Sequence, residues 1–565
     1  MFRKANTKLN LNTPVKNYTV LFLLVVIFIS LALTSAVRKS PVSDEAAHHI
    51  PVGYVFLTKG DFAFATDSPP LARILAALPL LSLDVKLPDE RSFWAREDRA
   101  EFSRDFLYKL NRSIFDKILL FARIPMMILG VFGGVFLFFW VRKHYDSQVA
   151  VLTAIFYFLS PNILAHSRFA TTDIAATVFI MCSVLSFWDF LISRRNIEAL
   201  ISGIFLALAM MAKYSALLLL PIYIILVLGT ILNERFFKGK RVSLDFFFKL
   251  LFCLFISALV LWSGYAFEFK PFLKDVLRPE SKIVVFTDML NSIPFAGEGF
   301  KAKAVEMLYT ASVPLGSFVL GVIGVLKHGA EGVGIFFMGA WRHQGHPLYY
   351  VAAFLLKTPI PVIIFFFIGL IFPVRNKSLN LYLLLMIFSF FVFASRSNLQ
   401  LGLRYVLPVY PFIFIISALG AKYVFNKGTV YKTFGIVLIL WFLTVPFFIW
   451  PDYLSYFNES IGGPDNGHKY LRDSNIDWGQ DLPALKQYML ENNIESVKLA
   501  YFGEGDPTYY GIRSEDITEI ELIEPEKEVY AISIRHIDSC RWTKDKKPDS
   551  KAGYSIFIYD LREKE

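Results

Sequence analysis

The stretch TVLFLLVVIFISLALTSAV, residues Thr19–Val37, runs directly into RKSPVSDEAAHHIPVGYVFLTKGDF, residues 38–62. A run of this length without a charge can cross about 30 Å of hydrocarbon as a helix. Basic residues precede the run as they do in a signal peptide, but the only cleavage-like site is the weak LTSAV. We therefore expect an uncleaved first span, with an acidic pair, Asp44 and Glu45, just beyond its end.

The rest of the chain continues this apolar pattern. Its 565 residues have a mean hydropathy of +0.48 and are 55% hydrophobic, well above the values of soluble proteins. Apolar runs long enough to span a bilayer recur up to about Trp450. They predict a mainly α, polytopic membrane protein with about eleven transmembrane helices, at residues 19–37, 118–140, 149–163, 174–192, 199–212, 215–232, 246–265, 348–373, 379–394, 405–425 and 434–450.

The Lys and Arg residues of the short loops predict the orientation, because such residues collect on the cytoplasmic side. Basic clusters at residues 3–16, 142–143, 194–195, 235–241, 375–377 and 427–432 predict a cytoplasmic N-terminus in the inner membrane and an extracytoplasmic tail. The apolar stretch Val305–Leu326 is predicted to stay outside as well. Its glycines and proline, and the parity set by Arg375, disfavour a crossing.

Two domains are predicted. Residues 1–450 form a transmembrane domain with a large first outer loop, 38–117, and an outer segment, 266–347. Residues 451–565 form a small soluble α/β domain, in which DLPALKQYMLENN is typical of a helix and SVKLAYFG, EVYAISI and YSIFIYDL are typical of strands. The first outer loop has helical periodicity broken by DSPPL, which predicts helices lying in the membrane interface. A loop of this length is usually functional.

The net charge of +10 is unevenly placed. Residues 451–565 hold 14 Lys and Arg against 23 Asp and Glu, which leaves 44 against 25 in the remainder. An excess of basic residues in the membrane part suits cytoplasmic loops and anionic lipid or phosphate partners. No feature of the sequence requires nucleic acid.

Ionisable residues outside the tail gather on the predicted outer face. Those that we single out are Asp44, Glu45, His48, Asp67, Arg73, Arg168, Asp173, Lys213, Arg342, Lys357, Arg396 and Arg404. Carboxylates and cations at the mouth of an apolar crevice suit a reaction on a lipid-linked anionic substrate. Plainer explanations stay open at this stage: an acidic first helix turn at Asp44 and Glu45, a helix N-cap at Asp173, and snorkelling lysines at positions 213 and 357.

Several common catalytic motifs are missing from the sequence. It contains no His-Glu-x-x-His pattern, no Walker glycine loop and no Gly-x-Ser-x-Gly elbow, so hydrolase and ATPase functions lose support. The three cysteines, Cys182, Cys253 and Cys540, have no metal-type spacing. We expect no tightly bound cofactor and assign no metal ligands.

Five segments in order resemble the bacterial members of glycosyltransferase family 39. They are DEAAHHIPVGYVFLTKGDF with DSPPLARILAALPL, HSRFATTDIAA, YYVAAFLLKTPIP, LGLRYVLPVYPF and YFNESIGGPDNGHKYLRDSNIDWGQDL. That family includes the protein O-mannosyltransferases and is related to the aminoarabinose transferases. The resemblance implies the GT-C membrane fold. It also implies transfer of a sugar from a polyprenyl-phosphate donor to a protein, lipid or glycan acceptor at the outer membrane face, with inversion.

The resemblance also implies roles for individual residues. Asp44 corresponds to the family's catalytic base and Asp173 to a second loop aspartate that helps build the site, while Glu45 is expected to support them. Pro69 and Pro70 lie in the Pro-Pro-Leu segment beside the donor pocket.

Two departures from the aminoarabinose transferases concern the lipid phosphate. Their Glu-Lys pair before Pro-Pro-Leu is Asp67-Ser68 here, and the arginine three residues after their aspartate is Ala47. Other cations must therefore bind the phosphate, and an aminoarabinose donor is put in doubt. We expect the phosphate ligands to be Arg404 and then Lys357, with Lys213, Asp67 and Arg73 also at the donor site. His48, Arg168 and Arg342 are assigned to acceptor or supporting positions.

Two other functions remain as alternatives. A transporter or flippase of lipid-linked sugars would have as many spans, but it predicts mid-bilayer charges and matching broken helices in two halves, and the sequence has no visible inverted repeat. The tail could instead carry the main function, with DSNIDWGQDL binding an acceptor sugar or peptide. We interpret that segment as the turn and cap that lead into a helix at Leu482.

Overall fold

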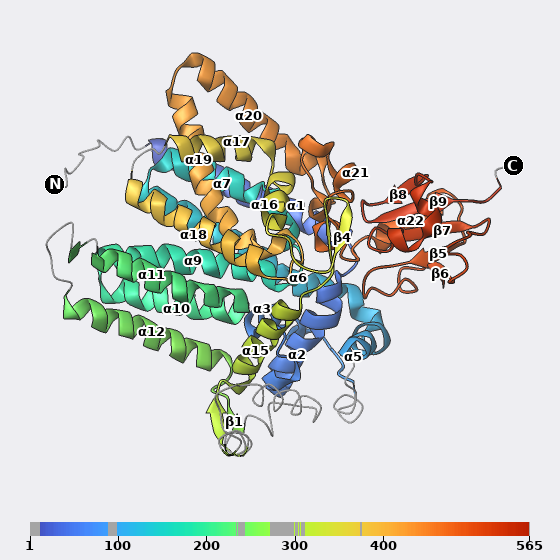
Figure 1. Ribbon diagram of the computed structural model, residues 1–565, viewed down its shortest axis with the longest axis horizontal. Coiled ribbons are helices and arrows are strands. Elements are labelled where there is room, and N and C mark those ends of the chain that lie inside the picture. Colours follow the sequence, from blue (N-terminus) through green and yellow to red (C-terminus); the bar gives the residue numbers. More distant parts are fainter. Residues whose placement is uncertain are drawn as a thin grey trace.

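The chain folds into a large helical region with a small sheet at one end (Figure 1). The computed structural model describes residues 12–88, 99–232, 234–235, 243–271, 299, 303, 306, 311–372 and 376–563. Within them, eight helices are long and apolar enough to cross a membrane, or up to ten if each of two bent pairs is one span. The predicted fold class, a mainly α polytopic membrane protein with a small C-terminal α/β region, is confirmed.

Each predicted span coincides with a helix or a helix pair. The eight continuous spans contain α1 (Asn12–Ala36), α6 (Phe115–His144), α9 (Thr172–Ser193), α11 (Leu219–Leu232), α12 (Leu244–Gly264), α18 (Lys377–Arg396), α19 (Tyr410–Asn426) and α20 (Thr429–Phe448). The apolar helix α10 (Asn196–Ala212) has 17 residues and is too short to count among them. The predicted number of eleven therefore exceeds the observed maximum of ten by this one helix.

Two predicted spans are broken. The helices α7 (Ser147–Phe158) and α8 (Pro161–Ser167) meet at 58°, and α16 (Tyr349–Lys357) and α17 (Ile360–Ile371) meet at 116°. A proline lies at each break: Pro161 is the first residue of α8, and Pro359 lies between α16 and α17. Proline lacks a backbone N–H and disfavours helical geometry in the residue before it. The continuous spans predicted at residues 149–163 and 348–373 were therefore wrong in detail. The bends leave His166 in the last turn of α8 and Lys357 at the end of α16.

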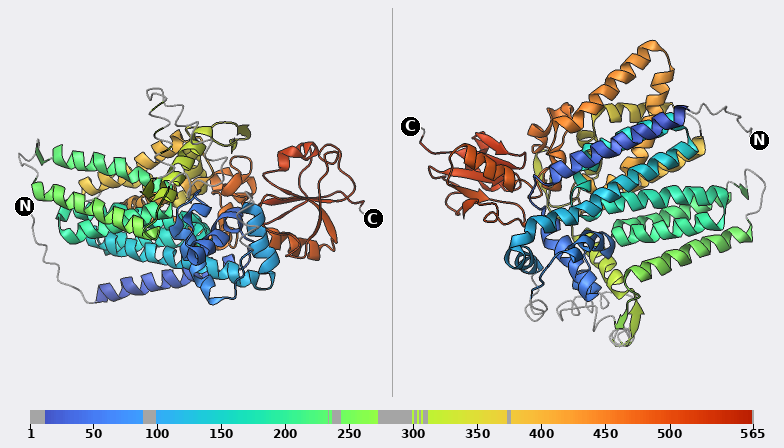
Figure 2. Two further views of the ribbon diagram at one scale, coloured as in Figure 1. Left: turned by 90° about the horizontal axis from the view of Figure 1, so that it is seen from below. Right: turned by 180° about the vertical axis from the view of Figure 1, so that it is seen from behind.

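Neighbouring helices pack closely where one of them has a small residue at the contact. In Figures 1 and 2, α9, α10 and α12 run side by side, and α17 lies against α19. A Cβ atom on Gly420 of α19 would lie 2.0 Å from the backbone oxygen of Phe365 in α17. Glycine therefore allows the two backbones to approach, as is common between membrane helices.

The first outer loop contains helices, as predicted. After a π-helical turn at Glu45–His49 come α2 (Ile50–Lys59), α3 (Pro70–Ala77) and α5 (Arg99–Arg104), while residues 89–98 lie outside the described residues. A Cβ on Gly53 of α2 would lie 2.1 Å from the backbone oxygen of Arg73 in α3. This close approach packs α2 on the helix that carries the Pro-Pro-Leu segment.

The outer segment contains short strands and one helix among its described residues. Two antiparallel strand pairs join β1 (Phe269–Pro271) to β2 (Ser312–Pro314) and β3 (Ile335–Phe337) to β4 (Ala340–Arg342). The helix α15 (Gly316–Glu331) covers the second half of the stretch Val305–Leu326 and is not among the candidate spans. Most of residues 272–310 lie outside the described residues, as do most of the predicted basic clusters at 3–16 and 235–241.

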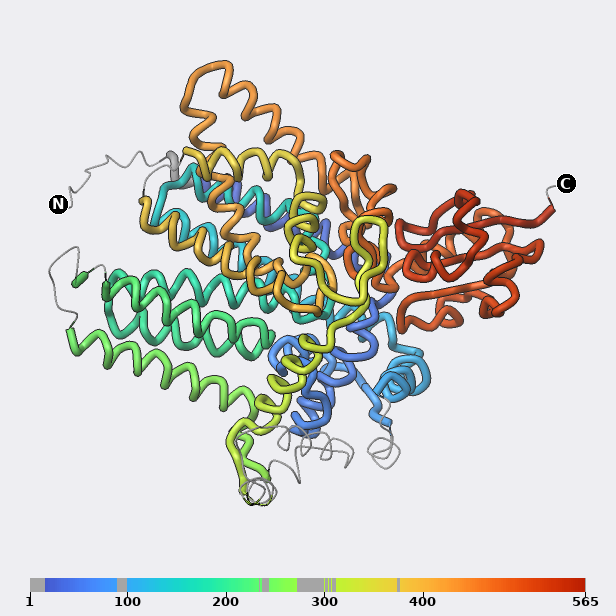
Figure 3. The backbone as a smooth tube through the Cα atoms, viewed as in Figure 1, coloured from blue at the N-terminus to red at the C-terminus, as the bar shows by residue number. Residues whose placement is uncertain are grey.

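The tail forms a five-stranded sheet in the order β6-β5-β7-β9-β8, with parallel pairing of β5 to β6 and β7 and antiparallel pairing elsewhere. Its elements are α22 (Leu482–Glu491), β5 (Ser496–Ala500), β6 (Arg513–Asp516), β7 (Val529–Ser533), β8 (Ser550–Ala552) and β9 (Ile556–Asp560). The predicted helix and three strands are confirmed, whereas the short strands β6 and β8 were not predicted. Residues 451–481, with the short helix α21 (Pro464–Gly467), lie between the helices and the sheet (Figure 3).

Candidate functional site

Asp44 and Arg404 meet although 360 residues separate them. Asp44 lies at the start of the first outer loop, and Arg404 lies in a short 3₁₀ turn before α19. Nη1 of Arg404 donates to Oδ2 of Asp44 at 2.7 Å, and its Nε donates to the backbone oxygen of Leu401 at 3.0 Å. The Asp44 side chain keeps 27% exposure and Arg404 keeps 10%. The pair is therefore largely desolvated but remains accessible on the Asp44 side.

A second carboxylate completes the cluster from the other side of Arg404. Asp173, in the first turn of α9, is fully buried. Its Oδ1 accepts a hydrogen bond from Nζ of Lys213 at 2.6 Å, and its Oδ2 lies 4.0 Å from Nη1 of Arg404. Nδ1 of His166 lies 3.5 Å from the same Oδ2. Two carboxylates thus face two cations in one buried group, so the two charge signs balance.

The pKa of Asp44 shows which effect dominates at this site. Burial by itself would raise it, but the neighbouring Arg404 guanidinium holds the pKa of Asp44 below its ordinary value. The pKa of Arg404 is raised despite burial, because Asp44 and Asp173 both stabilise its charge. Asp44 is therefore ionised at neutral pH and is held by a cation.

Glu45 is bonded to Arg123 and to backbone N–H groups, and none of its hydrogen bonds goes to the four residues of the cluster. Both oxygens are bonded by Arg123 of α6, Nε to Oε1 at 2.9 Å and Nη2 to Oε2 at 2.7 Å. The backbone N–H groups of Ala170 and Val42 complete the set at 2.7 and 2.9 Å. Glu45 is fully buried and has no contact left for a substrate. It connects the outer loop to α6 and to the segment before α9.

Arg123 was not singled out from the sequence, although a signal was present. It is a cation inside the apolar run predicted as the second span, and such residues usually have a partner and a role. Its guanidinium also donates to the backbone oxygens of Ala36, Lys39 and Ser40. It therefore fixes the backbone that leads from the first span to Asp44.

Asp67 and Arg73 form a separate ion pair beside the Pro-Pro-Leu segment. Nη2 of the buried Arg73 donates to Oδ2 of Asp67 at 2.6 Å, and Arg99 pairs with the other oxygen. Arg73 also donates to the backbone oxygens of Ala65 and Ser68 at 2.8 and 3.1 Å. Its guanidinium therefore holds the turn before Pro69 and leaves little for a donor phosphate.

The adjacent histidines differ in their surroundings. His49 is buried and accepts a hydrogen bond from Nε of Arg73 at 3.2 Å on Nδ1. Burial and the Arg73 charge lower the pKa of His49 to about 3, so it is neutral at physiological pH. His48 is 38% exposed, and its Nδ1 lies 3.9 Å from Oδ2 of Asp67. His48 therefore lies by the Asp67 pair and has solvent access.

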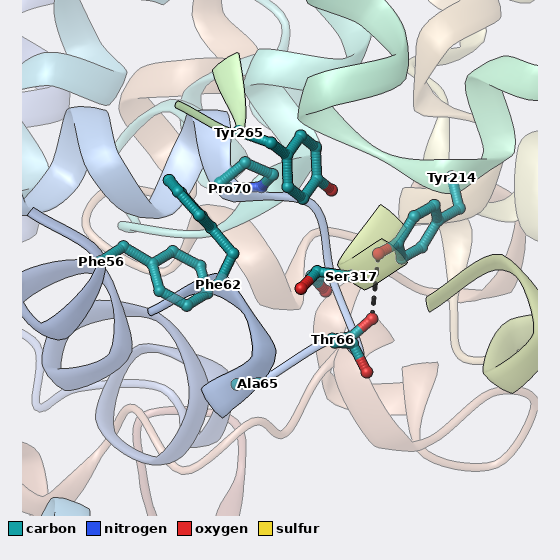
Figure 4. A pocket seen from close by; sticks show the side chains of 9 residues that line it. Phe56, Phe62, Ala65, Thr66, Pro70, Tyr214, Tyr265 and Ser317 are labelled. Carbon is teal, nitrogen blue, oxygen red and sulfur yellow. Dashed lines mark hydrogen bonds between the residues drawn. The ribbon is translucent and has the colours of Figure 1, made fainter. Parts of the chain in front are cut away.

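A small pocket lies beside the Pro-Pro-Leu segment. Pro70 and the aromatic rings of Phe56, Phe62, Tyr214 and Tyr265 line it (Figure 4). The Tyr214 hydroxyl donates to the backbone oxygen of Thr66 at 3.0 Å. Tyr214 follows Lys213 directly, so the pocket and the charged cluster share one turn of the chain. Pro69 and Pro70 are both buried.

Three further predicted site residues, Lys357, Arg168 and Arg342, also lie outside the cluster. Lys357 is 2% exposed and donates from Nζ to the backbone oxygens of Leu454, Tyr456 and Asn475 at 2.8, 3.0 and 2.5 Å. All three of its N–H groups are used within the protein, so none is free for the phosphate that the sequence analysis assigns to it. Arg168 is fully buried and donates to Ser35 and to the Pro451 oxygen. Arg342 is exposed on β4.

The cluster can supply a base and two cations. Asp44 can accept a proton, and Arg404 and Lys213 can bind an oxyanion if they exchange their carboxylate partners for it. Across the described residues, no group of three or more His, Cys, Asp or Glu side chains could hold a metal ion.

Residues 103–262 match the family model described as dolichyl-phosphate-mannose-protein mannosyltransferase. This confirms, over those residues, the resemblance predicted from the sequence. The matched part includes Arg123, Asp173 and Lys213, but not Asp44 or Arg404. No curated protein sequence matches the chain.

Several solved structures have a similar course of the chain. ArnT from Cupriavidus metallidurans bound to undecaprenyl phosphate aligns with a TM-score of 0.46 and 10% identity over 96% of this chain and 99% of that one. An Archaeoglobus fulgidus oligosaccharyltransferase tethered to an acceptor peptide aligns with a TM-score of 0.45 and 14% identity over 77% and 54%.

Proposed function

We propose that the protein is an inverting membrane glycosyltransferase that moves a sugar from a polyprenyl-phosphate donor to an acceptor at the outer face of the inner membrane. The observation that carries this proposal is the cluster of Asp44, Arg404, Asp173 and Lys213. The family model over residues 103–262, whose description names a lipid-phosphate sugar, supports the donor class.

Arg404 and Lys213 are the proposed ligands of the donor phosphate. Both are partly accessible, with 10% and 17% of their side chains exposed, and both now bind carboxylates. Two non-bridging oxygens of the donor phosphate can accept two parallel hydrogen bonds from the guanidinium fork, and their negative charge would replace that of the carboxylates. Glu45 and Arg123 act as support, since their polar atoms are used within the protein.

Asp44 is the proposed base. The acceptor oxygen attacks the anomeric carbon from the face opposite the phosphate, and the bond to the phosphate oxygen breaks with its electron pair. The acceptor proton passes to the Asp44 carboxylate, and the products are the glycosylated acceptor and the polyprenyl phosphate. Cations at the departing phosphate stabilise the developing charge, so the leaving group needs no acid.

Donor binding should make Asp44 a stronger base. While Arg404 holds Asp44, the lowered pKa makes the carboxylate a weak proton acceptor. When the phosphate takes the guanidinium, burial acts on Asp44 without that cation, and its pKa rises. The base is then strongest when the donor is in place.

The test compares a strain that lacks the chain with strains complemented by the wild type, Asp44→Asn or Asp84→Asn. Mass spectrometry of envelope glycans, lipids and proteins identifies the sugar that the deletion removes. The wild type and Asp84→Asn should restore it, because Asp84 is an exposed carboxylate of the same loop. Asp44→Asn should lower the initial rate roughly 100-fold or more, the effect of losing a general base.

Two outcomes would contradict this function. Full restoration by Asp44→Asn at normal protein levels would remove Asp44 as the base. Movement of lipid-linked sugar across the membrane with no glycosylated product in any fraction would favour the transporter alternative. The anomeric configuration of the product, determined by NMR against that of the donor, tests inversion.

A further inference from the structure

A tryptophan from the tail lies on the arginine that holds the proposed base. The guanidinium carbon of Arg404 lies 4.2 Å above the centre of the Trp478 ring. Trp478 is 2% exposed, and its ring also contacts Phe169 and His166, with centroids 6.2 and 6.3 Å away. The indole therefore covers one face of Arg404 and lies against the chain just before Asp173.

The segment that carries Trp478 also binds the backbone on either side of the ion pair. On the Asp44 side, the N–H of Ser43 donates to the Trp478 oxygen at 2.9 Å, and the N–H of Ser40 donates to the Gln480 oxygen at 3.1 Å. These two bonds fix residues 40–43 against residues 478–480. Asp44 follows this stretch directly.

On the Arg404 side, two side chains of the same segment hold residues 401–403. The Ser474 hydroxyl donates to the Leu401 oxygen at 2.6 Å, and the Leu403 N–H donates to Oδ1 of Asn475 at 3.0 Å. Gly402 between them has φ +88, and a Cβ there would lie 2.6 Å from the Ser474 hydroxyl oxygen. Glycine lets the loop before Arg404 approach the segment this closely.

The segment itself is anchored on both sides. Lys357 donates to the Asn475 oxygen at 2.5 Å, and Asn475 donates to the Tyr349 hydroxyl at 2.9 Å. At the other end, Nζ of Lys39 bonds Oδ1 of Asp481 at 2.5 Å, and the Ser555 hydroxyl donates to Oδ2 at 2.7 Å. Residues 474–481 therefore form a fixed element between the first span, α16 and the sheet.

We propose that Trp478 is a positioning residue for the transfer reaction: its ring orients the guanidinium of Arg404 and thereby sets the state of Asp44. This inference rests on the proposed function and extends it to the tail. A cation on a desolvated aromatic face is restricted to the plane that the ring allows. Without the ring, Arg404 can turn from Asp44, and burial then raises the proton affinity of the carboxylate.

The experiment measures kcat, KM for the donor and the pH profile of kcat/KM, with the donor identified by complementation. Trp478→Leu removes the ring, Trp478→Phe keeps an aromatic face, and Trp542→Leu is the matched control. Trp542 packs on Tyr530 and Tyr559 in the tail, away from Arg404. We expect Trp478→Leu to lower kcat/KM about 10- to 30-fold and to move its acidic limb to higher pH, with Trp478→Phe between it and the wild type.

Separate outcomes overturn the two proposals. If the wild type transfers sugar but Trp478→Leu and Trp542→Leu lose activity equally with unchanged pH profiles, Trp478 only stabilises the fold and this inference fails. If the wild type transfers no sugar from any polyprenyl-phosphate donor, the proposed function fails first. If Trp478→Leu does not accumulate, Trp478→Phe must still show the shifted acidic limb, and an unshifted limb would refute the positioning role.

Discussion

At the scale of single residues, the site depends on charges that compensate one another after burial. Asp44 and Asp173 are held by Arg404 and Lys213, and no carboxylate in the group lacks a cation within 4.0 Å. Removing one member of such a group leaves its partner buried without compensation, which costs more than the pair contributes. Substitutions in this group should therefore change both the free energy of unfolding and the pKa values of the remaining members.

Arg404→Gln should reverse the direction in which the pKa of Asp44 is shifted from its ordinary value. In the wild type the pKa of Asp44 is lower in the folded protein than in the unfolded chain. The ionised carboxylate therefore stabilises the folded protein above about pH 4, and this stabilisation disappears as the pH falls through the lowered pKa of the folded state. In the variant, burial dominates and the pKa rises. We expect the difference in Tm between wild type and variant to be large at pH 6–7, roughly 5 °C, and to shrink toward pH 3.

Thermal unfolding in detergent between pH 3 and 7 measures this difference. Arg396→Gln is the control, because Arg396 is exposed at the end of α18 and no ion pair of it is found among the described residues. A Tm difference for Arg404→Gln that is constant with pH would show that Arg404 does not control the titration of Asp44.

Lys213→Met should destabilise the protein and slow transfer. The change leaves the fully buried Asp173 with Arg404 at 4.0 Å as its remaining charged cation. Breaking a buried pair costs about 3 kcal/mol or more. The control is Lys249→Met, which removes an i,i+4 pair whose Asp245 is 65% exposed. Such a pair contributes about 0.5 kcal/mol or less. Equal Tm values for the two variants would contradict the buried-pair argument.

At the scale of elements, the sequence predicts helices better than breaks and contacts. Long apolar runs identify the spans because only a helix satisfies its backbone in lipid. A proline inside such a run does not by itself fix the angle, so the 116° bend after α16 was missed. The exposed strand β6 has no alternating pattern, since it is an edge strand with the sequence RSED.

The candidate site was predicted only in part, because a sequence pattern does not show which distant residues come into contact. Residue types and the family resemblance select Asp44, Asp173 and Arg404, but pattern alone does not show that a residue near position 404 meets one near 44. Trp478 was missed because an aromatic residue in a polar segment has many possible roles. Lys357 was assigned to phosphate, although backbone oxygens of a distant segment satisfy it.

The role of Lys357 can be tested at the junction of α16 and α17. Lys357→Met keeps most of the side-chain volume but leaves three buried backbone oxygens without its hydrogen bonds. Each loss costs about 1 kcal/mol or more. We expect Tm to fall by roughly 5 °C or more, while KM for the donor in the folded fraction stays within about threefold. A large rise in KM at unchanged Tm would instead return Lys357 to the phosphate site.

At the scale of the whole molecule, charge and hydropathy divide the chain into two parts. The part before residue 451 carries the excess of Lys and Arg, whereas the tail has 14 basic and 23 acidic residues. Basic residues in short loops stay on the cytoplasmic side during insertion. The acidic tail and the cluster at Asp44 should therefore lie together on the opposite side, where a lipid-linked donor can meet an envelope acceptor.

Cysteine labelling tests this orientation with little background. The three native cysteines, Cys182, Cys253 and Cys540, are buried, so a membrane-impermeant maleimide should react slowly with the wild type. Glu491→Cys puts a thiol at the exposed end of α22, and Asn196→Cys puts one at the exposed start of α10, beside the basic pair Arg194 and Arg195. In intact cells whose outer layers admit the reagent, Glu491→Cys should label at once and Asn196→Cys only after the inner membrane is opened. Labelling of each thiol is compared before and after the inner membrane is opened, so a difference in thiol reactivity between the two variants does not affect the result. The reverse labelling pattern would place Asp44 on the cytoplasmic side. The acceptor would then have to be cytoplasmic.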